Sequence, residues 1–188
     1  MPLDLNALLV PNPEGNDGDR SNSFARLLGE LQFIANATRP DIAYAVNRLA
    51  SYTANPSMQH VGVLKCILRY LSGTRTYSIM YKILPQEPSF FFGYTDASYG
   101  NADDHRSISR YIFLTGDGTI TWCSRKQTTI ALSSTEAEYV ALSEAAQEAC
   151  WLRSLYSKLG LLQEEVPTLI WGDNEGLIAM AKNLQFHK

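Results

Sequence analysis

The sequence predicts an α/β domain of the α+β type, built on a mixed sheet and preceded by a small helical region. Two observations lead to this fold class. Residues 23–85 hold three helix signals in close succession, whereas residues 89–181 read in order as three strands, a long helix, a strand and a helix. The second order favours a sheet with a crossover helix packed on it.

The composition is that of a globular chain long enough for one or two small domains. Of its 188 residues 45% are hydrophobic, yet no run reaches the roughly 18 apolar residues that a membrane helix requires. The first residues also lack the charged-then-apolar pattern of a signal peptide. Cys66, Cys123 and Cys150 are far apart, and the three histidines have no metal-ligand spacing. We therefore expect an intracellular protein with no membrane partner, no disulfide bonds and no zinc.

Charge and composition divide the chain into three parts. Residues 1–22 read as a flexible N-terminal segment, residues 23–85 as a helical region and residues 86–188 as the sheet domain. Residues 1–85 carry 8 Lys+Arg and 6 Asp+Glu, a net charge of +2, whereas residues 86–188 carry 8 and 13, a net charge of −5. The acidic part therefore needs bound cations, and help from the basic part or from a larger polypeptide, if it handles nucleic acid.

Three helix starts are visible in the helical region. Ser23 is expected to cap the first helix, and Thr38–Asp41 reads as a cap with Pro40 in the first turn of the second. Asn55 opens the third, which Gly73 ends. Apolar residues at helical spacing follow each start, so we expect a small bundle of three amphipathic helices.

Alternating and β-branched residues indicate five strands. They are expected at residues 76–83, 89–94, 107–114, 119–124 and 168–171. The segment Gly116-Asp117-Gly118 is a hairpin signal between the third and fourth of these strands. Asp96 would then lie at or just past the end of one strand, and Asp173 just past the last strand, before a short helix at residues 175–181.

The long helix is expected to begin at a capping box. In such a box the Ser133 hydroxyl accepts a hydrogen bond from the Glu136 N–H, and the Glu136 side chain reaches back to the N–H of the cap itself. No Gly or Pro interrupts residues 139–159, and Gly160 is the expected end of the helix.

The two acids at the start of this helix face different ways. The residues three, seven and eleven positions after Glu138 are all alanine, so its carboxylate stands at the end of an apolar stripe that faces the core. Glu136 faces a more polar side, and capping already accounts for it. An ionised acid beside a core is costly unless a cation or a full set of donors meets it. On its own, however, Glu138 is better explained as a partly solvated acid that favours the helix dipole.

Asp96, Glu138 and Asp173 together suggest a metal site. Strand ends and the start of a crossover helix can converge on one edge of a sheet. Clustered carboxylates repel one another unless a hard cation lies among them, and oxygen ligands select Mg²⁺ or Mn²⁺ over Zn²⁺. Each acid also has an ordinary explanation: a turn former for Asp96, a helix cap for Asp173 and a dipole partner for Glu138. Spacing alone supports a metal site about as well as it supports these alternatives.

A series of longer motifs runs through the second half of the chain. They are Gly93–Ser98, Asp103–Ser107, Trp122–Gln127, Ala131–Tyr139 and Asp173–Asn174. These motifs closely resemble the ribonuclease H domain of copia-type retrotransposon polyproteins. Upstream, Ala37–Ile42 and Leu68–Thr74 resemble the stretch that joins the reverse transcriptase to that domain. The resemblance covers residues 23–188, implies a ribonuclease H-like fold, and identifies residues 23–85 as a reverse transcriptase connection region.

The resemblance also implies an activity. It implies hydrolysis of the RNA strand of RNA–DNA hybrids during reverse transcription, with two Mg²⁺ ions or with Mn²⁺ in their place. Asp96, Glu138 and Asp173 match the catalytic, metal-binding acids of the family, and Asp96 matches the one that bridges both ions. The expected partners are an RNA–DNA hybrid and the remainder of a reverse transcriptase polypeptide. The expected location is the cytoplasm, within a virus-like particle, or the nucleus.

Three departures from the family limit what the resemblance implies, and an alternative stays open. The fourth metal-binding acid of the family lies on a closing segment, which we expect to be lacking because the chain ends at Lys188, so the domain would be incomplete. Asp103-Asp104 lies in a polar loop and does not replace the aspartate pair of a polymerase. Arg110 stands where similar sequences tend to have Gly. The alternative is a catalytically weak or inactive retrotransposon-derived remnant that acts only as a structural or binding module.

Overall fold

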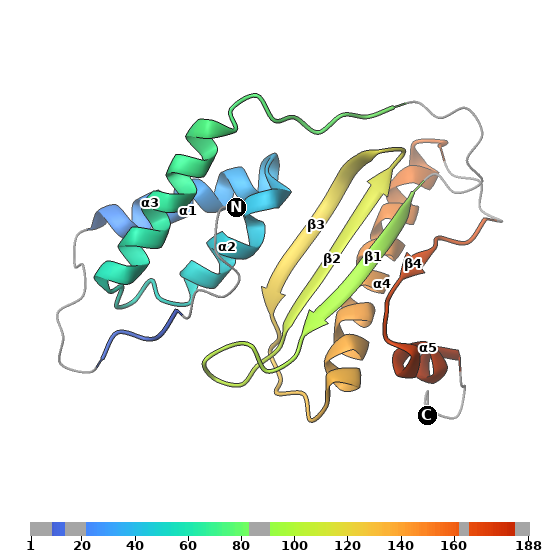
Figure 1. Cartoon of the computed structure of the whole chain (residues 1–188). Helices are drawn as coiled ribbons and strands as arrows, with labels where there is room; N and C mark the ends of the chain where they lie inside the picture. The colour runs from blue at the N-terminus through green and yellow to red at the C-terminus, as the bar shows by residue number, and fades with distance from the viewer. Residues whose placement is uncertain (1–8, 14–21, 83–90, 162–165, 183–188) are drawn as a thin grey trace. The chain divides into compact units, whose positions relative to one another are not determined.

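The computed structural model describes residues 9–13, 22–82, 91–161 and 166–182, and the structural statements below concern these residues (Figure 1). Most of the N-terminal segment and parts of two expected strands, at residues 83 and 89–90, lie outside them. The chain forms two compact units, Met1–Ser78 and Ile79–Lys188. None of the described helices has the length and apolar character needed to cross a membrane.

The first unit is the expected bundle of three helices. They are α1 (Asn22–Ala37), α2 (Pro40–Ala50) and α3 (Met58–Gly73). Each contributes fully buried apolar side chains to a common core, including Leu31 from α1, Ile42 from α2 and Ile67 from α3. Burying each side chain of this size stabilises the fold by about 1.5–3 kcal/mol.

Two of the three helix starts differ from the prediction. Ser23 lies inside α1. Ser57 rather than Asn55 precedes α3, and it forms a capping box in which its backbone N–H donates to Nδ1 of His60 at 2.9 Å. A histidine in this position is not part of the usual capping pattern, which expects Glu or Gln, so the pattern did not reveal it. Pro40 is the first residue of α2, as expected.

The strand expected at residues 76–83 is wrong over its described part, because residues 76–82 form neither strand nor helix. Alternation predicts a strand only where one face becomes buried, and Tyr81 in this segment is 58% exposed. Its hydroxyl donates to the Thr119 carbonyl at 2.8 Å, which associates it with the second unit through a side chain. The two compact units divide between Ser78 and Ile79.

The second unit is built on a four-stranded mixed sheet, which confirms the α/β fold class. The strands are β1 (Phe92–Ser98), β2 (Ile108–Thr115), β3 (Gly118–Lys126) and β4 (Ile170–Trp171). Their order is β3-β2-β1-β4, with β1 antiparallel to β2, β2 antiparallel to β3, and β1 parallel to β4. The expected hairpin joins β2 to β3, and Gly116 within it has a φ of 54°. This arrangement is a partial ribonuclease H-like fold.

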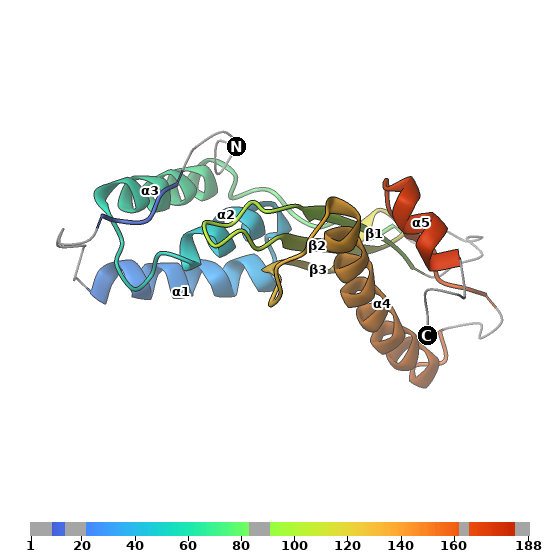
Figure 2. The ribbon, with the colours of Figure 1, turned by 90° about the horizontal axis from the view of Figure 1, so that it is seen from below.

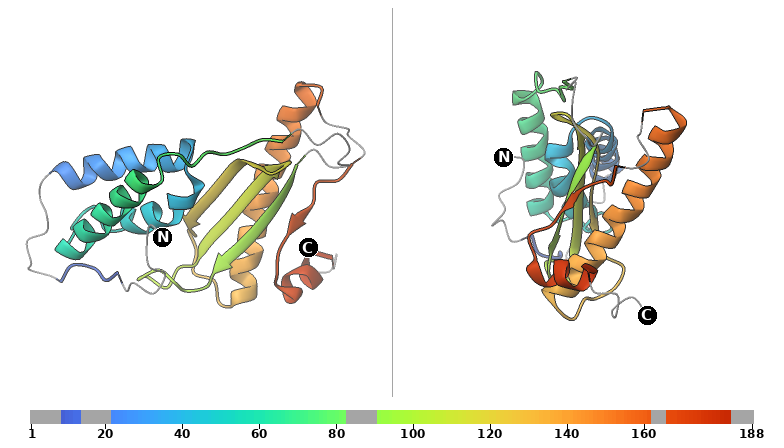
Figure 3. Two further views of the ribbon diagram at one scale, coloured as in Figure 1. Left: turned by 45° about the horizontal axis from the view of Figure 1, so that its top comes forward. Right: turned by 90° about the vertical axis from the view of Figure 1, so that its right-hand side faces the viewer.

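A single long helix lies along one face of this sheet (Figures 2 and 3). This helix, α4 (Ser134–Lys158), ends just before Gly160, whose φ of 69° fits the left-handed turn expected at a helix end. A short helix, α5 (Glu175–Lys182), follows β4. The order of three strands, a long helix, a strand and a helix is therefore as predicted.

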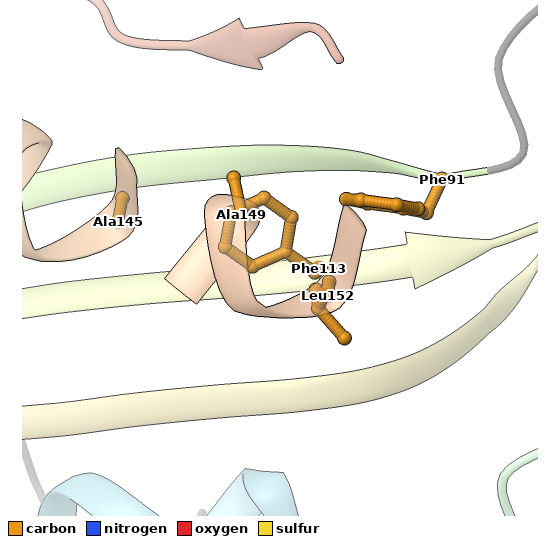
Figure 4. Close-up of a cluster of buried hydrophobic side chains, with 5 residues drawn as sticks. All are labelled: Phe91, Phe113, Ala145, Ala149 and Leu152. Carbon is orange, nitrogen blue, oxygen red and sulfur yellow. The ribbon is translucent and has the colours of Figure 1, made fainter. Parts of the chain in front are cut away.

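The contact between α4 and the sheet forms an apolar core (Figure 4). Its buried members are Phe91, Phe113, Ala145, Ala149 and Leu152. The two phenylalanine rings meet edge to face with centroids 6.0 Å apart. Ala145 and Ala149 have small side chains, which let the helix approach the sheet. Gly93 is required beneath this core, because a Cβ added there would overlap the Phe113 ring.

Candidate metal centre

The three acids singled out from the sequence come from different elements and meet at one end of the sheet. Asp96 belongs to β1, Glu138 to the first turns of α4, and Asp173 to the link between β4 and α5. One carboxylate oxygen from each lies within 4.8 Å of the other two. Asp96 lies inside β1, two residues before its last residue Ser98, and not at or past the strand end as predicted.

Glu138 is the buried member of the group. Its side chain is only 7% exposed, and its Oε2 atom has no hydrogen-bond partner among the described residues. Burial raises the pKa of this carboxyl above its ordinary value, and the charges of Asp96 and Asp173 raise the pKa further. A hydrogen bond from the Ala97 N–H and the charge of Arg110 oppose that rise. A buried oxygen without a donor, beside two other carboxylates, is suited to a cation.

The neighbouring acid Glu136 has a different task. The Ser133 hydroxyl accepts a hydrogen bond from the Glu136 N–H at 3.1 Å, as a capping box requires. The Glu136 side chain accepts from the Leu132 N–H at 2.7 Å, one residue before the predicted donor. Glu136 is thus occupied at the helix start, and Glu138 is the acid that faces Asp96 and Asp173.

The ordinary explanations for the two aspartates do not hold. The cap of α5 is Asn174, whose Oδ1 accepts from the Leu177 N–H at 2.9 Å, so Asp173 is not needed in that role. Asp96 is not a turn former, because it lies within β1 directly opposite Arg110 of β2. Its side chain is 50% exposed.

Gln127 fixes the start of α4 against the sheet. Its side chain is 1% exposed, and its Nε2 donates both to the Ser109 hydroxyl at 3.0 Å and to the Ala137 carbonyl at 2.8 Å. Ser109 lies opposite Ala97, which follows Asp96, and Ala137 precedes Glu138. One amide therefore links the strand paired with Asp96 to the helix turn that carries Glu138.

Arg110 brings a positive charge to the same place. Its Nη1 lies 3.2 Å from Oδ2 of Asp96, and the two residues face each other across β1 and β2. The Arg110 side chain is 35% exposed, so water screens the pair and limits its contribution to stability.

Known proteins resemble this chain over most of its length. It is 34% identical over 187 residues, or 98% of its length, to the retrovirus-related Pol polyprotein from transposon TNT 1-94 of Nicotiana tabacum. It is 40% identical over 162 residues, or 86% of its length, to the corresponding polyprotein from transposon RE2 of Arabidopsis thaliana. The chain belongs to the copia-type retrotransposon Pol polyproteins.

The chain represents a small part of these Pol polyproteins, since it spans 14% of the TNT 1-94 protein and 11% of the RE2 protein. It is also 43% identical over 126 residues to secreted RxLR effector protein 161 of Plasmopara viticola, a match that covers 66% of this chain and 87% of that protein. No protein-family model matches the chain, and no solved structure matches it.

The sequence of this Pol region predicted the three acids but only some of the residues that surround them. Gln127 received no role, although its position directly after a strand and inside a recognised motif was a signal that could have revealed it. Arg110 was noticed as unusual, but its contact with Asp96 depends on strand register, which the sequence did not supply. The resulting centre offers oxygen ligands only, and such a set fits a hard divalent cation.

Proposed function

We propose that this region of a retrotransposon Pol polyprotein is a ribonuclease H, which cleaves the RNA strand of RNA–DNA hybrids with divalent metal. The observation that carries the proposal is the meeting of three carboxylates within 4.8 Å, one of them buried with an unpartnered oxygen. Asp96, Glu138 and Asp173 would hold two Mg²⁺ ions, or Mn²⁺. When bound, such ions activate a water molecule and stabilise the leaving oxygen of a phosphodiester.

The residues of the chain prepare the site in distinct ways. Glu138 supplies a carboxylate from the protein interior, where water competes least for a cation. Asp96 is half exposed, so it can contact both the interior and an approaching substrate. Gln127 keeps the first turn of α4 at a fixed position beside β1 and β2. Positions held in this way cost no rearrangement when charge develops in the reaction.

The proposed substrate and partners follow from charge and from the family. Residues 86–188 carry a net charge of −5, so a nucleic acid would be held through bound cations and through other parts of a longer polypeptide. A reverse transcriptase polypeptide would supply them, in a cytoplasmic virus-like particle or in the nucleus. The 2′-hydroxyl and the shape of the heteroduplex would separate RNA from DNA.

The test is cleavage of an end-labelled RNA–DNA hybrid by the whole chain in Mg²⁺ and in Mn²⁺, together with calorimetric titration of Mn²⁺. We expect Asp96→Asn to lower cleavage about a hundredfold or more and to weaken Mn²⁺ binding, because it removes the negative charge of one of the three residues that would hold the metal. Asp117→Asn is the matched control, since Asp117 lies in the β2–β3 turn and pairs with Lys82.

Equal Mn²⁺ binding by the wild-type chain and Asp96→Asn would refute the metal centre. Cleavage of a DNA duplex at the same rate as the hybrid would refute the substrate assignment while leaving the centre intact. If Asp117→Asn also lost both RNA cleavage and Mn²⁺ binding, the losses in Asp96→Asn would reflect general damage to the fold and would not support the metal centre.

A second candidate is a binding or structural module that does not cleave. Two observations favour it: Arg110 already pairs with Asp96, and a protein matched over 87% of its length is named as a secreted effector rather than as a polyprotein. This candidate predicts that the chain binds Mn²⁺ or the hybrid without cutting RNA even at saturating metal. Cleavage that depends on Asp96 would exclude it.

A further inference from the structure

The ion pair between Arg110 and Asp96 lies inside the group of acids proposed to bind metal. Arg110 stands directly opposite Asp96 on the neighbouring strand, and its Nη1 is 3.2 Å from Oδ2 of Asp96. The Asp96 carboxylate is also one of three whose ligand atoms lie within 4.8 Å of one another. The Asp96 carboxylate is thus the partner of the Arg110 guanidinium and also a proposed ligand of the divalent cation.

The two cations cannot use this carboxylate independently. A guanidinium nitrogen at hydrogen-bond distance occupies a lone pair of the carboxylate and also places a positive charge beside the centre. A divalent ion of the same sign gains less from Asp96 while that charge stays in place. Arg110 therefore compensates the acids when metal is absent and opposes the metal when it binds.

The ion pair between Arg110 and Asp96 is open to solvent. The Arg110 side chain is 35% exposed and the Asp96 side chain 50% exposed, which is typical of an ion pair that solvent weakens. The guanidinium end of such a long side chain can be solvated while its stem stays packed. The ion pair consequently does not block the three acids, but it has to break before Asp96 can bind a metal ion with its full charge.

We propose that Arg110 is an internal cation that competes with the divalent metal for Asp96 and thereby lowers the metal affinity of the centre. This inference rests on the metal centre of the proposed function. It identifies Arg110 as a residue that tunes affinity; it does not make Arg110 a metal ligand or a catalytic residue.

Calorimetric titration of the whole chain with Mn²⁺ tests the competition without any activity assay. We expect Arg110→Gln to bind Mn²⁺ about fivefold more tightly, which corresponds to the loss of one half-exposed ion pair. Arg110→Lys keeps the charge and should stay within about twofold of the wild type. Arg125→Gln is the matched control, because Arg125 lies on the next strand and pairs with Glu144 of α4 at 3.1 Å.

Thermal unfolding supplies a second readout, because the effect of Arg110→Gln on the melting temperature should differ between the metal-free and the metal-bound protein. In EDTA, Arg110→Gln should melt about 2–4 °C below the wild type, since the three carboxylates lose their compensating charge. With saturating Mn²⁺ this deficit should disappear or reverse. A deficit that is the same with and without Mn²⁺ would show that Arg110 merely stabilises the fold, and it would overturn the proposal.

The failures of the two proposals are distinguishable. If Asp96→Asn weakens Mn²⁺ binding and Arg110→Gln leaves it unchanged, the metal centre stands and the competition is wrong. If neither substitution changes the affinity, both are wrong. If Arg110→Gln loses binding of the RNA–DNA hybrid with no gain in Mn²⁺ affinity, Arg110 holds a phosphate and does not compete with metal.

Discussion

At one end of the contact between α4 and the sheet, Phe113, Ala145 and Leu152 bury only carbon atoms, whereas at the other end Glu138 buries a carboxylate beside Asp96. Both ends belong to the same stripe of the helix, because Ala145 lies seven residues after Glu138. The apolar end therefore stabilises the position in which the acidic end is held. The acidic end costs stability unless a cation compensates it.

The largest predicted effect is at the apolar end. Phe113→Ala should destabilise the fold by about 3–5 kcal/mol, because it removes a fully buried ring from the core and leaves a cavity beneath α4. Chemical denaturation monitored by circular dichroism measures this loss. Phe33→Ala is the matched control, since Phe33 is 75% exposed and the same substitution there should change stability by less than about 0.5 kcal/mol. Equal losses in the two variants would contradict the assignment of the core.

Glu138→Gln should have a smaller effect with the opposite sign. In EDTA it should stabilise the protein by about 1 kcal/mol at neutral pH, because a buried carboxylate with an unpartnered oxygen becomes neutral. The same variant should bind Mn²⁺ more weakly than the wild type. Thermal melts and calorimetry on one preparation give both values. If Glu138→Gln were clearly less stable than the wild type in EDTA, hydrogen-bond donors would already stabilise the Glu138 carboxylate without a cation, and the prediction would be wrong.

The pH dependence of the wild type sharpens the same comparison. Burial raises the pKa of Glu138 in the folded protein above its value in the unfolded chain, so the folded state favours the protonated form. The favourable contribution of Glu138 to the stability of the fold is fully present below its pKa in the unfolded chain. It is lost as the pH rises through its pKa in the folded protein. In EDTA the stability advantage of Glu138→Gln over the wild type should therefore grow across that window. An advantage that does not vary with pH would contradict the raised pKa.

The smallest effect is expected two residues earlier, at Glu136. Glu136→Gln should change stability by less than about 0.5 kcal/mol and leave Mn²⁺ binding unchanged, because the amide oxygen of Gln can accept the hydrogen bond from the Leu132 N–H. The measurement is the same pair of assays used for Glu138→Gln. If Glu136→Gln weakens Mn²⁺ binding and Glu138→Gln does not, the roles of the two acids are exchanged.

Local patterns in the sequence were enough to predict the order of elements in the sheet unit and the inward face of Glu138. Capping, glycine stops and helical spacing are local, and α4 follows them from Ser133 to Gly160. The strand expected at residues 76–83 failed because alternation does not reveal whether a face will be buried.

The surroundings of the acids depend on contacts between residues far apart in the chain. Asp96 meets Arg110 only through the register of β1 and β2, and Gln127 reaches Ala137 only because α4 folds back onto the sheet. Neither contact follows from spacing along the sequence, so the sequence predicted which acids would meet but not what would hold or oppose them.

The position of Gln127 affects which sequence changes this region can tolerate during evolution. Its side chain connects β2 to the first turn of α4 directly, and this link does not run through the exposed residues 128–130. Insertions or deletions in that loop should leave the spacing of Asp96 and Glu138 intact, whereas a change at Gln127 itself would release it. The loop beside the three acids is thereby free to vary in sequence while the spacing of the acids is kept.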